Sequence, residues 1–171
     1  TELSAVSDAD LVVEAATENR DLKFRIFEEI DRHAPAGAIL ATNTSSISIT
    51  EIASRTRRPE QVIGMHFMNP VPVMKLVEVI RGLSTSDETY QTVFGFAQSL
   101  GKEPITAPDK PGFIVNRLLV PYMLDAIRAY EEGVGTVQEI DDAMKAGAGH
   151  PMGPLTLADF VGLDTMGSIC D

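Results

Sequence analysis

His66 is the side chain in this sequence best placed to transfer a proton. It stands near the end of residues 62–67, an apolar stretch that predicts a strand, and Asn69 and Pro70 follow as the start of a turn. An imidazole exchanges its proton near neutral pH. A histidine at the carboxyl end of a strand is therefore a candidate general acid or base.

Glu78 is the candidate partner of this histidine. It lies twelve residues later with two apolar residues on each side, which favours a buried carboxylate over a surface one. If residues 62–67 and 75–80 pair as a hairpin centred on Pro72, His66 and Glu78 face each other about 5 Å apart. The carboxylate would then orient the imidazole and stabilise its protonated form. Spacing alone also leaves open a purely structural His–Glu pair.

Three further groups of polar side chains are candidates for binding. Residues 43–46, Asn-Thr-Ser-Ser, follow a predicted strand at 38–42, although such a run also suits a plain turn. Asn116 is a single amide at the start of an apolar helix and could simply make a helix hydrogen bond. Glu18 and Lys23 could bind a ribose or pair with each other across a helical turn.

Strand and helix signals alternate through the first two-thirds of the chain, which predicts a mostly parallel α/β sheet. Such a sheet generally binds ligands at the carboxyl ends of its strands. We expect strands at 11–15, 38–42, 62–67, 75–80 and 103–106, and helices at 19–33, 48–55 and 86–100.

A second, all-helical domain is predicted from residue 111 onward. Its helices are expected at 113–132, at 136–146 and from Leu155 onward, separated by glycine-rich segments. Residues 108–112, Pro-Asp-Lys-Pro-Gly, form the joint, so we divide the chain into domains at 1–110 and 111–171.

Composition excludes several classes of partner. A formal net charge of −11 argues against nucleic acid, and the basic run at 55–58 suits a solvated loop. Cys170 is the single cysteine, and no Cys/His spacing suggests a metal site. No apolar run approaches the ~18 residues that span a bilayer. We expect no membrane partner. His33 and His150 lie near predicted helix ends, and we expect them to be capping or surface residues.

Taken together, these stretches resemble the 3-hydroxyacyl-CoA dehydrogenase family. The resemblance extends from Asp10 to Asp164 and rests on several long motifs in order. They are residues 10–15, 43–46, 64–70, 111–117 and 147–154. The family's Gly-rich turn and its acidic residue for the adenine ribose have no counterpart here, so we expect the distal part of a Rossmann-type dinucleotide-binding domain and an incomplete helical domain.

The resemblance implies a reaction and its residues. NAD⁺ would oxidise an (S)-3-hydroxyacyl-CoA, with 3-hydroxybutyryl-CoA as the expected substrate, to the 3-oxoacyl-CoA. His66 would be the general base and Glu78 its partner, and Ser45 and Asn116 would contact the substrate. Glu18, Lys23 and Asn43 match positions that the family uses around the nicotinamide half of NAD. No metal is needed.

Two alternatives and three expectations accompany this interpretation. The alternatives are a sugar-acid dehydrogenase of the crystallin-like branch and a non-catalytic structural or dimerisation module. The resemblance implies a homodimer through the helical domain, and a cytoplasmic location, or the mitochondrial matrix in a eukaryote. Without a Gly-rich turn to accept the pyrophosphate, we expect these residues alone to bind NAD poorly and to be inactive.

Overall fold

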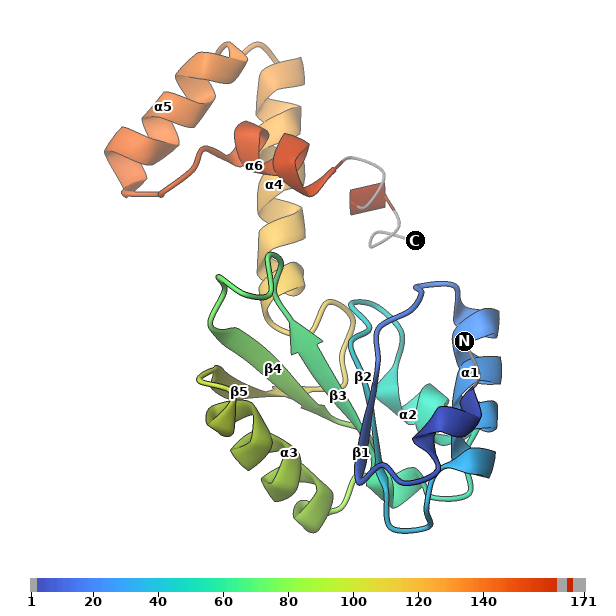
Figure 1. The fold of residues 1–171 in the computed structure, drawn as a ribbon. Coiled ribbons are helices and arrows are strands. Elements are labelled where there is room, and N and C mark those ends of the chain that lie inside the picture. Colours follow the sequence, from blue (N-terminus) through green and yellow to red (C-terminus); the bar gives the residue numbers. More distant parts are fainter. Residues whose placement is uncertain (1–2, 163–165, 168–171) are drawn as a thin grey trace. The chain divides into compact units, whose positions relative to one another are not determined.

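The computed structural model describes residues 3–162 and 166–167, and it divides into two compact units, residues 1–113 and 114–171 (Figure 1). Each unit is described by itself. Cys170, Asp164 and the predicted end of the third helix lie outside the described residues.

The first unit alternates strands and helices as the sequence predicts. Asn19, Ser48 and Ser86 cap its three α-helices, each accepting a hydrogen bond from a backbone N–H in the first turn. In chain order the elements are the 3-10 helix η1 (Leu3–Val6), β1 (Leu11–Glu14), α1 (Arg20–His33), β2 (Ile39–Thr42), α2 (Ile49–Ala53), the 3-10 helix η2 (Pro59–Gln61), β3 (Val62–Phe67), β4 (Leu76–Arg81), α3 (Asp87–Ser99) and β5 (Glu103–Pro108).

The five strands form one mixed sheet in the order β1-β2-β3-β4-β5. Neighbouring strands are parallel except β3 and β4, which form the predicted antiparallel pair. β5 lies at one edge and contains Pro104 and Pro108, which an edge strand tolerates because proline has no N–H to donate. β1 lies at the other edge of this sheet.

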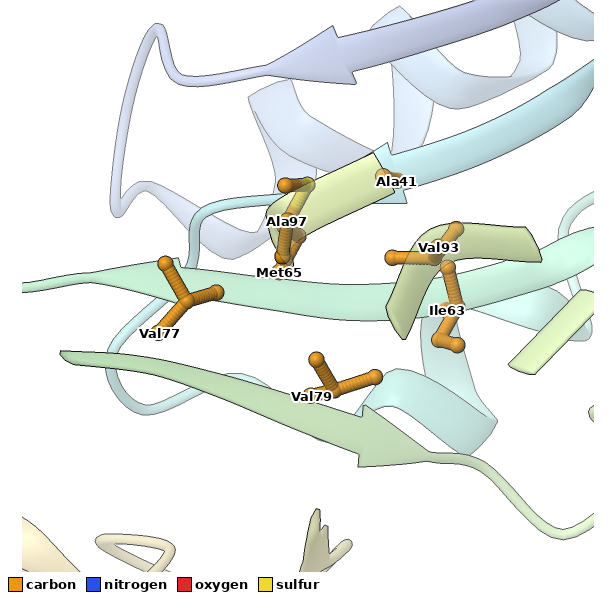
Figure 2. Packing of buried hydrophobic residues seen from close by; sticks show 7 residues of the cluster. All are labelled: Ala41, Ile63, Met65, Val77, Val79, Val93 and Ala97. Atoms are coloured by element: carbon orange, nitrogen blue, oxygen red, sulfur yellow. The ribbon is translucent and has the colours of Figure 1, made fainter. Parts of the chain in front are cut away.

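Side chains alternate between the two faces of the sheet, and each face is covered by helices (Figure 1). On one face α3 packs Val93 and Ala97 against β2, β3 and β4 (Figure 2). The strand residues in this cluster are Ala41, Ile63, Met65, Val77 and Val79. His66 and Glu78 alternate with these residues, so they point to the face that α1 and α2 cover.

Gly64 allows α2 to approach the second face closely. A Cβ atom there would lie 2.8 Å from the Cβ of Ile80 and 2.9 Å from the Cδ1 of Ile49. Only a glycine fits without displacing one of these buried side chains. The close approach fixes α2, and hence the loop before it, against the strand that carries His66.

Asp31 ties the end of α1 to the loop after α2. Its carboxylate accepts hydrogen bonds from Arg57 Nε at 2.8 Å and Arg58 Nε at 2.7 Å. Burial raises the pKa of Asp31, but the hydrogen bonds from the two arginines outweigh burial and lower it below its usual value. The basic run at 55–58 is therefore partly structural.

The second unit contains α4 (Val115–Glu131), α5 (Val137–Ala148) and α6 (Pro154–Val161). Thr136 and Glu139 form a capping box at the start of α5, and Gly149 ends that helix in the left-handed conformation. A core of Val120, Met123, Ala158 and Met166 packs α4 against α6. None of the helices among the described residues is long and apolar enough to cross a membrane.

Asp141 organises the start of α6. Its carboxylate accepts hydrogen bonds from the backbone N–H groups of Leu155 at 2.8 Å and Thr156 at 2.9 Å, and from the Thr156 hydroxyl. Burial raises the pKa of Asp141, but these hydrogen bonds outweigh it and lower the pKa. A Cβ atom at Gly153 would overlap the Asp141 carboxyl, so the glycine leaves the room that this contact needs.

The two remaining histidines differ in their surroundings. His33 is exposed beside Glu29 at the end of α1, as expected of a surface residue. His150 is half-buried, and its Nδ1 lies 2.9 Å from the Tyr122 hydroxyl. His150 follows Gly149 at the end of α5, near a helix end as expected, and a tyrosine 28 residues earlier in the chain provides the partner of its ring.

Candidate active site

His66 and Glu78 form a buried hydrogen-bonded pair. They are directly opposed in the antiparallel pair of β3 and β4, and His66 Nδ1 lies 2.8 Å from Glu78 Oε2. His66 is 5% exposed and Glu78 is 0% exposed. The pairing predicted from the twelve-residue spacing is confirmed.

Ser45 contacts the other nitrogen of the imidazole. Its Oγ lies 3.0 Å from His66 Nε2. Ser45 belongs to the loop between β2 and α2, at the carboxyl end of a parallel strand, where ligands bind in such sheets. Ser45 and His66, two candidate residues 21 positions apart in the sequence, are therefore in direct contact.

Glu18 holds this loop from the end of β1. Its carboxylate accepts a hydrogen bond from the Thr44 hydroxyl at 2.7 Å and another from the Ser45 backbone N–H. The loop geometry is thus set by a side chain 27 residues away from Ser45. Glu18 also remains exposed and can meet a ligand.

Asn43 joins the carboxyl ends of three strands. Its backbone N–H donates to the Glu14 carbonyl of β1 at 2.8 Å, and its side-chain Oδ1 accepts from the Phe67 N–H of β3 at 2.8 Å. Asn43 itself follows β2 directly. It therefore fixes the strand end next to His66, in addition to its predicted place beside a cofactor.

Lys23 is buried in an ion pair with Glu14, so the alternative of a Glu18–Lys23 pair was wrong. The Lys23 ammonium contacts Glu14 Oε2, and the Thr42 hydroxyl donates to the same oxygen at 2.9 Å. Lys23 and Glu14 are both buried. The pair forms because the first turn of α1 packs over the ends of β1 and β2, a contact that helical spacing alone does not reveal.

A hollow of about 270 Å³ opens at the carboxyl ends of β1 and β2. It is lined by all three predicted cofactor residues and by Ser45. Its walls are Ala15, Ala16, Thr17, Glu18, Lys23, Asn43 and Ser45. The hollow and the His66 ring therefore share Ser45 as a common wall.

Asn116 is described with the second unit, apart from the residues above. It is the second residue of α4 and belongs to the second unit. Its predicted contact with substrate stays a prediction. Glu14, by contrast, was missed from the sequence, although a carboxylate ending a strand that is otherwise apolar was a signal of a buried charge.

Family models match both units of the chain. Residues 1–110 match the NAD binding domain of 3-hydroxyacyl-CoA dehydrogenase, and residues 112–171 match the C-terminal domain of the same enzyme. The chain is 52% identical over 166 residues to the 3-hydroxybutyryl-CoA dehydrogenase of Clostridioides difficile, covering 97% of this chain and 59% of that protein. It is 53% identical over 168 residues to the mitochondrial hydroxyacyl-coenzyme A dehydrogenase of Homo sapiens, covering 98% of this chain and 54% of that protein.

Solved structures agree with the sequence matches. The (S)-3-hydroxybutyryl-CoA dehydrogenase of Ralstonia eutropha superposes with a TM-score of 0.96 at 51% identity, over 99% of this chain and 60% of that one. The 3-hydroxybutyryl-CoA dehydrogenase of Escherichia coli gives 0.93 at 46% identity, over 98% and 36%. The chain spans less than two-thirds of the length of these relatives. It belongs to the 3-hydroxyacyl-CoA dehydrogenase family.

Proposed function

We propose that this chain forms part of an NAD-dependent dehydrogenase that oxidises the 3-hydroxyl group of an (S)-3-hydroxyacyl-CoA to a ketone. The observation that carries the proposal is the imidazole of His66, buried between the Glu78 carboxylate and the Ser45 hydroxyl. The names of relatives more than 50% identical support a short substrate, 3-hydroxybutyryl-CoA.

The partners of His66 support one of its two nitrogens as the base. An ionised carboxylate can only accept hydrogen bonds, so the Nδ1 that faces Glu78 carries the proton. Nε2 then carries no proton, and its lone pair accepts a hydrogen bond from the Ser45 hydroxyl. Nε2 is therefore the atom that takes the proton from the substrate hydroxyl, and Ser45 marks the position where that hydroxyl binds.

Glu78 balances the charge that proton transfer creates. When Nε2 takes a proton, the ring becomes an imidazolium, and a carboxylate 2.8 Å from Nδ1 stabilises it. Because both groups are buried, the attraction is less screened than in water. The pair therefore favours the protonated product of the base step.

The hollow lined by Glu18, Lys23 and Asn43 fits the nicotinamide end of the cofactor. It lies at the carboxyl ends of parallel strands, and its 270 Å³ suits one end of a dinucleotide rather than the whole molecule. When bound, NAD⁺ accepts the hydride from the substrate carbon. The wall shared at Ser45 supports a nicotinamide that binds next to the base. The homodimer and the substrate contact of Asn116 stay predictions.

His66→Ala in the full-length protein tests the proposal. Loss of a general base typically lowers the rate by ~10²-fold or more. We expect kcat for 3-hydroxybutyryl-CoA to fall by at least that factor. His33→Ala, which removes an exposed histidine on α1, is the matched control and should leave kcat unchanged. An unchanged kcat in His66→Ala would overturn the assignment, and faster turnover of a sugar acid than of any acyl-CoA would favour the other branch.

A further inference from the structure

Phe113 has an unusual backbone conformation. Its φ of 47° is the only positive value among the non-glycine residues that the structure describes, and Gly112 before it has φ 75°. A left-handed conformation is unfavourable for a residue with a side chain, because its Cβ crowds the following carbonyl oxygen. Such a conformation persists only where the surroundings impose it, and it often marks a functional site.

The Phe113 ring lies against the imidazole of His66. The ring centroids are 5.5 Å apart with an interplanar angle of 62°, an edge-to-face contact. Phe113 is 3% exposed. Burial of a phenylalanine side chain is strongly favourable and offsets the backbone cost. The strained backbone is thus stabilised by the contact that its own side chain makes.

Asp109 anchors the segment that carries Phe113. Its carboxylate accepts hydrogen bonds from the Ile49 N–H at 3.0 Å and from the Thr50 N–H at 2.9 Å. It also accepts from the hydroxyls of Ser48 at 2.8 Å and Thr50 at 2.6 Å. Four hydrogen bonds therefore attach residue 109 to the start of α2, just after the loop that contains Ser45.

A tight turn transmits this anchor to Phe113. The Phe113 N–H donates to the Lys110 carbonyl at 2.9 Å, which closes the turn between the anchor and the ring. One connected structure therefore surrounds His66. It consists of Ser45 in the loop before α2, Asp109 hydrogen-bonded to the start of α2, and Phe113 after the turn.

The hydrogen bonds of His66 oppose one motion of the ring only weakly. Glu78 and Ser45 hold Nδ1 and Nε2, which fixes the axis through the two nitrogens. They resist tilting of the ring about that axis only weakly, because hydrogen-bond strength depends gently on small angular changes. The Phe113 ring packs edge-to-face against the imidazole, and such a contact can oppose this tilt.

We propose that Phe113 is a positioning residue for His66, and that Asp109 holds it in place. The ring fixes the tilt of the imidazole and excludes water from it, so that Nε2 presents its lone pair to the substrate rather than to solvent. This inference rests on the proposed function for its catalytic consequence. Its structural part, the restraint and shielding of the His66 ring, stands without it.

NMR of the full-length protein tests the shielding without measuring activity. The measured quantity is the rate at which the His66 Nδ1 proton exchanges with water. We expect Phe113→Leu and Asp109→Asn to accelerate exchange by about tenfold or more. Phe113→Gly is the sharper variant, because it removes the ring together with the rest of the side chain and at the same time relieves the backbone strain. It should accelerate exchange at least as much as Phe113→Leu.

Two control variants separate positioning from a general loss of stability. Phe94→Leu truncates a ring of α3, which covers the opposite face of the sheet from His66. Asp31→Asn weakens a different carboxylate anchor in the same unit, and this one is buried. Both should leave the exchange rate of the His66 proton unchanged at matched stability. Exchange that is equally slow in wild type and Phe113→Gly would overturn the proposal.

Kinetics of the full-length protein test the catalytic consequence. We expect Phe113→Leu to lower kcat about tenfold with KM changed by less than twofold, because the ring acts on the base. A KM rise at constant kcat would overturn the positioning role. If His66→Ala retains activity, the proposed function fails, yet the exchange measurement still decides whether Phe113 shields the ring.

Discussion

Replacing Glu78 with glutamine isolates the charge of the buried pair from its geometry. Glutamine has nearly the same shape, and its side-chain oxygen can still accept the hydrogen bond from His66 Nδ1. What disappears is the negative charge beside the imidazolium that forms during the reaction. The variant should therefore fold like the unmodified protein and react more slowly.

The structure sets the size of the effect. With about 4 Å between charge centres and an effective dielectric constant of about 20, a carboxylate and an imidazolium attract by about 4 kcal/mol. If half to all of the imidazolium charge has formed in the transition state, about 2–4 kcal/mol is lost. Each 1.36 kcal/mol changes a rate tenfold, so kcat should fall by roughly 30- to 1000-fold.

Steady-state kinetics of the full-length protein with 3-hydroxybutyryl-CoA measure this loss. KM should change little, because Glu78 is 0% exposed and acts through His66. Glu103→Gln is the matched control, since Glu103 lies on the neighbouring strand β5 in an exposed pair with Lys75. A Glu78→Gln variant with native circular dichroism and kcat within threefold of the unmodified protein would refute the charge argument.

Three further predictions concern stability. Gly64→Ala should lower the free energy of unfolding of the first unit by about 1–3 kcal/mol in urea titrations, because the new Cβ would meet Ile80 and Ile49. Gly95→Ala in α3, where the space around the new Cβ is open, should not lower it. Glu14→Ala should lower the free energy of unfolding by about 3–5 kcal/mol, because it leaves the Lys23 ammonium buried without its counter-ion. Adding Lys23→Met to Glu14→Ala should recover part of that loss. An equal loss in the double variant would contradict the ion-pair argument. Because its pKa is lowered, Asp141 contributes stability that is fully present above the unfolded pKa of about 3.9 and disappears as pH falls through the folded pKa. Thermal unfolding of the second unit between pH 5 and 2 should therefore depend more weakly on pH in Asp141→Asn. An unchanged pH dependence would count against the anchor.

Local patterns predicted the elements and the central pair of the site. The capping residues Asn19, Ser48 and Ser86 act within three residues of their partners, so the sequence displays them directly. The alternation of side chains in two strands around a short turn was enough to place His66 opposite Glu78. These features depend on short-range geometry, which is the same in every protein.

Long-range polar contacts were not predictable in this way. Asp109 accepts hydrogen bonds from residues 59 to 61 positions earlier, and Glu14 meets a lysine of the next helix and a threonine of the next strand. Nothing in the spacing specifies which carboxylate reaches which donor once helices pack on a sheet. For the same reason Lys23 was assigned Glu18 as an alternative partner, when packing gives it Glu14.

The two edges of the sheet differ in whether another strand can join them. The backbone N–H of Glu103 at the start of β5 donates toward the β4 side, to the Lys75 carbonyl. Backbone groups alternate in direction along a strand, so the backbone groups of residues 104, 106 and 108 point away from the sheet. Two of these three are prolines, so the outer side of β5 offers Thr106 as its one backbone donor. β1 contains no proline along Leu11–Glu14. The sheet can therefore be extended beside β1, while its β5 side resists accidental pairing with a second chain.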